Sequence, residues 1–187
     1  MPVDMAVLVG DVAAETAVTR GLVADLSETG WRTPTPAPGW DIADQIGHLA
    51  YFDQVAVLAA VDPKRFRAEL TAMQATDTDA EATAAGYRDR SGVQILAWFD
   101  QARTGLLATF KDLDPAARLP WFGPAMSAAS SLTARLMETW AHTQDVADAL
   151  GISVDRVSVK GKTNEGVGAL GRGEAIAVHA IALLRSR

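Results

Sequence analysis

Four long stretches of this 187-residue chain repeat apolar residues every three or four positions, the spacing of one face of an α-helix. They run over residues 4–28, 41–61, 91–113 and 127–150. Alternating runs of β-branched residues are scarce, and alanine, the strongest helix former, is the commonest residue. The pattern therefore predicts an all-α fold in which four amphipathic helices pack as a bundle.

Residues at the ends of these stretches are typical helix caps. Asp41, Ser91 and Ser127 precede the second, third and fourth stretches and predict their N-caps, and Asp44 stands three residues after Asp41. Gly151 predicts the C-terminal end of the fourth helix. We expect Gly30 to stop the first helix, ahead of a proline-rich loop.

The connections between the helices differ in length. Residues 63–90 are ambiguous, with a helical part over Arg65–Gln74 and a polar remainder. A segment of this length between the second and third long helices suits a crossover connection better than a simple up-and-down bundle. Residues 114–126 contain three prolines and two aromatic residues, and we expect a loop there.

Composition excludes several classes of protein. The chain has no cysteine, which excludes disulfides, thiolate metal sites and a cysteine nucleophile. Its net charge of −6 argues against nucleic acid as a partner. It has no apolar run near the ~20 residues of a membrane span, and its N-terminus does not resemble a signal peptide. We therefore expect a cytoplasmic protein with no membrane partner.

The composition changes after Gly151. Residues 151–187 hold six of the 15 glycines, and six Lys/Arg stand there against three Asp/Glu. We expect residues 1–151 to form the bundle and 152–187 an atypical tail, with a short strand and a helix packed on the bundle or on a partner subunit. The tail spells GxGxxG over 166–171 but lacks the surrounding βαβ unit, which argues against a dinucleotide site.

The chemistry-bearing residues lie on the second and fourth stretches. Glu138 and His142 are four apart, which places both side chains on one helix face. His48, one of only three histidines, lies in the middle of the second stretch. These three side chains would complete a metal site with an open position, and their ligand set suits Zn²⁺, with Ni²⁺, Co²⁺ or Fe²⁺ as alternatives. The simpler interpretation is an exposed Glu–His ion pair.

Three segments carry a resemblance to a known family. The segments GWDIADQIGHLAYFD, LAWFDQAR and LPWFGPAMSAASSLTARLMETWAHTQDVADALG resemble the DinB-like superfamily, and most closely the N-terminal metal-binding domain of mycothiol-dependent maleylpyruvate isomerase and its actinobacterial relatives. The resemblance covers roughly residues 5–151. It implies a DinB-like four-helix bundle in which His48, Glu138 and His142 hold a divalent metal, commonly zinc.

The same resemblance implies a thiol reaction. A small thiol such as mycothiol would act as co-substrate in the transfer or isomerisation of a small electrophile, because a divalent cation stabilises the thiolate form. Relatives are often homodimers, and they usually continue into a second α/β domain that the tail does not match. Activity on maleylpyruvate itself is therefore expected to be weak or absent.

Other residues are candidates near the site. Asp44 and Asp145 could accept hydrogen bonds from the imidazoles, or be solvated helix residues. Arg135 could bind a substrate carboxylate or pair with a neighbouring acid. Trp121, with Phe122 and Met126, could line the pocket mouth or belong to the core. His179 is expected to have no ligand role.

Two other functions stay open at this point. A metal-holding bundle without turnover could serve in sensing or stress response, and a helical interaction domain would need none of these side chains. The same metal could instead activate water for hydrolysis. A ligand set that leaves one coordination position open favours an enzyme over a binding module.

Overall fold

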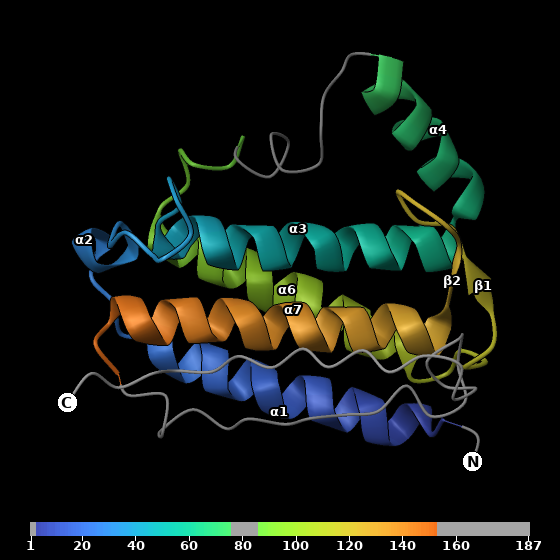
Figure 1. Cartoon of the computed structure of the whole chain (residues 1–187), viewed down its shortest axis with the longest axis horizontal. Helices are drawn as coiled ribbons and strands as arrows, with labels where there is room; N and C mark the ends of the chain where they lie inside the picture. Colours follow the sequence, from blue (N-terminus) through green and yellow to red (C-terminus); the bar gives the residue numbers. More distant parts are fainter. Residues whose placement is uncertain (1–2, 76–85, 153–187) are drawn as a thin grey trace. The chain divides into compact units, whose positions relative to one another are not determined.

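The computed structural model describes residues 3–75 and 86–152, and the described residues from Asp4 onward belong to one compact unit. Four long helices form it: α1 (Met5–Val23), α3 (Ile42–Val61), α6 (Gly92–Phe110) and α7 (Ala128–Ala149) (Figure 1). The helices α2 (Glu28–Trp31) and α4 (Pro63–Ala75) are shorter, and β1 (Arg118–Leu119) pairs antiparallel with β2 (Met126–Ser127). The all-α prediction is confirmed.

The long helices form a bundle in which α3 packs on α6 and α7, and α1 packs on α7 and α6. In Figure 1, α3 and α6 run in the same direction and α1 and α7 run in the opposite one. Two successive parallel helices need a crossover connection, as the length of the 63–90 segment predicts. The largest core cluster consists of Val23, Trp31, Ile42, Ala43, Ile46, Leu49, Ala50, Ile95, Trp98, Phe99, Ala102 and Val146.

Local capping chemistry sets the starts of all four long helices, and Asp4 caps α1 by accepting from the Ala6 N–H. Asp41 and Asp44 form a reciprocal capping box at the start of α3, and Ser91 forms another with Gln94 at α6. Ser127 accepts from a backbone N–H in the first turn of α7. At the other end of α7, Gly151 adopts a positive φ of 68°. These ends agree with the prediction from sequence.

The first helix differs from the prediction. It ends at Val23, and a separate turn of helix, α2, begins after Ser27 and contains Gly30. Ser27 accepts a hydrogen bond from the Gly30 N–H, so its hydroxyl nucleates a new helix instead of continuing the old one. Gly30 therefore lies inside a helix and does not mark the end of the first one.

Trp31 of α2 lies against the first residue of α6. The first residue of α6 is Gly92, and a Cβ atom there would fall on the Trp31 indole. Both Gly92 and Trp31 are buried. The absence of a side chain at position 92 thus allows the helix to begin against the indole face.

Among the helices that the structure describes, none has the length and apolarity that a membrane span needs.

Candidate metal centre

Two neighbouring helices bring the three predicted ligands together. His48 lies in the middle of α3, and Glu138 and His142 lie one turn apart on α7. One ligand atom from each of the three lies within 4.8 Å of the others. Glu138 Oε2 is 3.7 Å from His48 Nε2 and 3.4 Å from His142 Nε2, so both imidazoles turn the same nitrogen toward one carboxylate.

These separations fit a divalent cation. Tetrahedral coordination with bonds of ~2.0–2.1 Å places neighbouring ligand atoms about 3.4 Å apart. The observed separations from Glu138 Oε2 are close to that value. Two neutral imidazoles and one carboxylate are a donor set that zinc accepts, and three protein ligands leave a fourth position for another molecule. The residues therefore fit the implied metal.

Burial and charge tune the groups at this centre. The His48 side chain is 11 % exposed, and burial is the main cause that lowers its pKa below 6.5; the charges of His142 and Arg135 lower it further. Contacts of His142, and then of His48, with its carboxylate lower the pKa of Glu138 well below 4.5. A neutral imidazole beside an ionised carboxylate is the state in which these groups bind a metal.

Aromatic rings pack against both imidazoles. Trp40, in the loop before α3, stacks on His142 with planes 2° from parallel and centroids 5.9 Å apart. The Trp40 ring also lies 5.2 Å from that of His48, and the Phe52 ring lies 4.5 Å from that of His48. The loop is closed by a hydrogen bond from the Thr35 N–H to the Trp40 carbonyl. These rings restrict the orientations open to the imidazoles.

The hydrogen-bonding partner of His142 is Gln45, a residue that the sequence pattern did not single out. Its side-chain oxygen lies against His142 Nδ1, and its amide nitrogen is 3.3 Å from Asp145 Oδ2. Asp145, predicted to accept from an imidazole directly, therefore reaches His142 only through Gln45. In the sequence, Gln45 stands three residues after Ile42 and four before Leu49, so a polar residue on the apolar face is the signal that could have found it.

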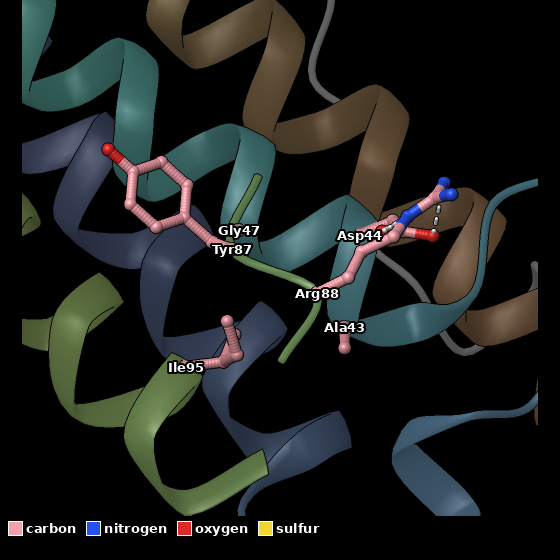
Figure 2. Close-up of a pocket in the computed structure, with 6 residues that line it drawn as sticks. All are labelled: Ala43, Asp44, Gly47, Tyr87, Arg88 and Ile95. Carbon is pink, nitrogen blue, oxygen red and sulfur yellow. Dashed lines mark hydrogen bonds and ion pairs between the residues drawn. The ribbon is translucent and has the colours of Figure 1, made fainter. Parts of the chain in front are cut away.

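Asp44 has a different role from the one predicted. Its carboxylate caps α3 through the Asp41 N–H and binds the Arg88 guanidinium, with Arg88 Nε to Asp44 Oδ1 at 2.7 Å. His48 Nδ1 is buried without a hydrogen-bonding partner in the part of the chain described, so Asp44 does not accept from it. Asp44 and Arg88 instead line a small pocket with Ala43, Gly47, Tyr87 and Ile95 (Figure 2).

Arg135 lies inside the bundle and is paired with an acid. Its Nε is 2.9 Å from Asp53 Oδ1, and its side chain is 4 % exposed. Arg103 Nε lies 2.8 Å from the other oxygen of Asp53. Of the two roles predicted for Arg135, the geometry favours the ion pair. Sequence reasoning missed Asp53 and Arg103, although an acid among the buried positions of α3 indicates a partnered charge.

Trp121 belongs to an aromatic cluster that begins next to His48. Its ring stacks on Phe66, with centroids 6.2 Å apart, and lies 6.3 Å from Phe52 and 5.3 Å from Phe122. Trp121 and Phe122 are partly exposed, as is Met126 at the start of β2. The cluster thus joins the 114–126 loop to the side of the metal centre. His179 lies outside the described residues.

The fold and the site together define a helical bundle with a two-histidine, one-carboxylate centre. The chain belongs to the family described as the mycothiol maleylpyruvate isomerase N-terminal domain, whose model matches residues 12–147. An uncharacterised protein of Mycobacterium tuberculosis is 44 % identical over 152 residues, which cover 77 % of this chain and 56 % of that protein. The chain thus spans little more than half the length of this relative.

A solved structure has the same fold. The crystal structure of mycothiol-dependent maleylpyruvate isomerase matches with a TM-score of 0.56 at 13 % identity, over 77 % of this chain and 61 % of that one. A histidine-to-alanine mutant of that enzyme gives a TM-score of 0.59. At this identity, the likeness supports the shared bundle and leaves substrate and activity open.

A second similarity covers the C-terminal residues. The YgbB family model matches residues 134–185. A 2-C-methyl-D-erythritol 2,4-cyclodiphosphate synthase of Laribacter hongkongensis is 63 % identical over 38 residues, which is 20 % of this chain and 24 % of that protein. Most of the YgbB match lies beyond the described residues, and it includes the GxGxxG sequence at 166–171.

Proposed function

We propose that this chain is a metal-dependent enzyme that uses a small thiol, such as mycothiol, in the transfer or isomerisation of a small electrophilic substrate. The observation that carries the proposal is the convergence of His48, Glu138 and His142 on one point in a chain of this family. We propose zinc as the metal and the cytoplasm, where thiols stay reduced, as the location.

Some residues of the site would bind the metal, and others would hold the imidazoles in place and limit the access of water. His48, Glu138 and His142 would hold the cation, which when bound stabilises the thiolate form of a coordinated thiol at neutral pH. Trp40 and Phe52 would keep the imidazoles in place and limit the access of water from their sides. The partly exposed Trp121 would offer an apolar surface to the substrate.

The charges around the site favour an anionic group on the substrate or the thiol. The positive charge of Arg135 is among the lesser causes that lower the pKa of both His48 and Glu138, after burial for His48 and the two histidines for Glu138. Because Asp53 occupies the Arg135 Nε, this charge would act at a distance instead of as a direct clamp on a carboxylate.

Two measurements test the proposal. Elemental analysis of protein purified without added metal should find about one equivalent of a divalent metal, and His142→Ala should lose most of it, whereas His179→Ala, the matched control, should keep it. A screen of thiols and electrophiles should then show turnover that a chelator abolishes and Zn²⁺ restores.

The alternative is a metal-binding bundle without turnover, with a role in sensing or stress. A fully loaded protein that turns over no thiol and electrophile pair would favour that function. Stoichiometric metal retained by His142→Ala would contradict the site itself.

A further inference from the structure

The buried amide of Gln45 makes three polar contacts, which reach a loop and a second helix. The Gln45 side chain projects from α3 at 0 % exposure. Its nitrogen Nε2 is 2.9 Å from Thr35 Oγ1, in the loop before α3, and 3.3 Å from Asp145 Oδ2 on α7. Its oxygen Oε1 contacts His142 Nδ1, also on α7. The amide thus links the loop, α3 and the predicted metal ligand.

The partners of the amide fix which way it faces. The Thr35 hydroxyl donates its own hydrogen to the Trp40 carbonyl, 3.0 Å away, so toward Gln45 it can only accept. An ionised Asp145 carboxylate also only accepts. Both hydrogens of the Gln45 NH₂ group therefore have acceptors, and the carbonyl oxygen is left to face His142. The opposite orientation would set two acceptors against the carbonyl oxygen and leave one N–H group without an acceptor, even if His142 Nδ1 accepted the other.

The orientation of the amide decides the tautomer of His142. A carbonyl oxygen only accepts, so the contact with Gln45 requires a hydrogen on His142 Nδ1 and opposes the Nε2–H form whose hydrogen Glu138 Oε2 could accept. In the neutral imidazole, Nε2 is then the atom with the lone pair, and this is the atom 3.4 Å from Glu138 Oε2. A metal ligand needs a lone pair on the nitrogen that faces the ion.

We propose that Gln45 is a positioning residue that holds His142 in the Nδ1–H tautomer and turns the Nε2 lone pair toward the centre shared with His48 and Glu138. The contacts from Asp145 to Gln45 and from Gln45 to His142 orient the imidazole, and Thr35 is the second partner that holds the Gln45 amide. The use of this tautomer for metal binding rests on the proposed function, whereas the tautomer itself does not.

His48 provides the contrast inside the same centre. Its Nδ1 is buried and has no hydrogen-bonding partner among the described residues, so no polar contact at that nitrogen selects its tautomer, and the rings of Trp40 and Phe52 pack against it. Of the two imidazoles, His142 is the one whose tautomer is selected by a polar side chain, that of Gln45.

The test is ¹⁵N NMR of the full chain labelled on histidine, in mildly alkaline buffer and without metal. Long-range proton–nitrogen correlations distinguish the two tautomers, and we expect the Nδ1–H pattern for His142. Gln45→Met, which keeps the length of the side chain and removes the acceptor, should give a mixture of tautomers. It should also weaken Zn²⁺ binding, measured by competition with a chromophoric chelator, by about 10- to 100-fold.

Two further variants separate positioning from packing. Gln54→Met, at an exposed position of the same helix, should change neither the tautomer nor Zn²⁺ affinity. The double variant Gln45→Glu with Asp145→Asn keeps an acceptor at His142 and the total charge, so it should restore the Nδ1–H pattern.

The outcomes are distinguishable. An Nε2–H tautomer in the unaltered chain overturns the inference, and this measurement needs no variant that might misfold. Gln45→Met with an unchanged tautomer overturns it as well. If the chain binds no Zn²⁺ while His142 shows the Nδ1–H tautomer and Gln45→Met disturbs it, the proposed metal function fails and the positioning role stands.

Discussion

Asp53 and Arg135 form an ion pair inside the bundle, with side chains 0 % and 4 % exposed and 2.9 Å between Oδ1 and Nε. The second oxygen of Asp53 faces Arg103 at 2.8 Å, so two buried guanidinium groups share one carboxylate. Asp53→Asn keeps the shape and removes the charge. We expect the free energy of unfolding to fall by about 3–5 kcal/mol, measured by urea denaturation, because buried guanidinium groups lose their counter-ion.

An exposed pair provides the control for that variant. Asp100 binds Arg20 Nε at 3.1 Å, with side chains 38 % and 51 % exposed. Asp100→Asn should change the free energy of unfolding by no more than about 1 kcal/mol, because water screens the pair. Equal losses for Asp53→Asn and Asp100→Asn would contradict a special role for the buried pair.

The charge of Glu138 should matter for metal affinity. Glu138→Gln keeps an oxygen near both imidazoles and removes the negative charge that attracts a cation. We expect Zn²⁺ affinity, measured by chelator competition, to fall by more than the ~10- to 100-fold typical of losing an outer hydrogen-bonding partner. Glu69→Gln, which alters an exposed ion pair with Arg65 on α4, should leave the affinity unchanged.

Acid should destabilise the metal-free chain through the same centre. Because the pKa of His48 is lowered below 6.5 on folding, the unfolded state takes up the proton first, and stability is lost as the pH falls through 6.5 toward the folded pKa. The lowered pKa of Glu138 contributes stability that is present above 4.5 and is lost as the pH falls below it.

Urea midpoints measured from neutral pH to about pH 4 should therefore decrease steadily. His48→Gln should remove the first part of the decrease, near pH 6.5, and keep the acidic part. A midpoint that rises as the pH falls through this range would be inconsistent with both assignments.

The start of α6 should tolerate only glycine. Gly92→Ala would place a methyl group on the Trp31 indole, and we expect a loss of about 1–3 kcal/mol in the free energy of unfolding from overpacking. Gly105, on the same helix, has no neighbouring atom within 4 Å of the position that a Cβ would take, so Gly105→Ala should stabilise by up to about 1 kcal/mol. Similar effects at both positions would argue against the Trp31 contact.

Assembly is open to a direct test. The C-terminal residues 176–184 contain Ile176, Val178, Ile181, Leu183 and Leu184, and we predict a homodimer that covers such apolar surface. Light scattering should give twice the chain mass at micromolar concentration, and a variant ending near Gly151 should dissociate. Two monomeric samples would refute the dimer.

The helix starts could be predicted from sequence because capping is local. Asp41, Ser91 and Ser127 each bind a backbone N–H within three residues, so the residues that decide the boundary are its neighbours. The predicted end of the first helix was wrong for a related reason. The Ser27 hydroxyl accepts the Gly30 N–H and starts a second helix, whereas the apolar pattern indicates one continuous helix. The β1–β2 pair is too short for any periodic pattern to reveal it.

The three candidate metal ligands could be predicted from the sequence, whereas the buried polar residues around them could not. Glu138 and His142 share a helix face by spacing alone, and His48 stands out as one of only three histidines, in the middle of the second predicted helix. The family resemblance implies the same three ligands. Gln45 and Asp53 depend on which residues of other helices face them, and the sequence does not state those neighbours. The C-terminal change in composition was visible, whereas its similarity to the YgbB family required comparison with other proteins.

Gln45 and His142 lie 97 positions apart in the sequence. No local segment can preassemble such a centre, so it forms only when α3 and α7 have docked. A ligand that binds there recognises the native state and not the unfolded chain, and it adds RT ln(1 + [L]/Kd) to stability. The melting temperature of this bundle is therefore itself a gauge of site occupancy: titrating the chain with candidate ions or thiols and following its Tm would rank them without any assay of turnover.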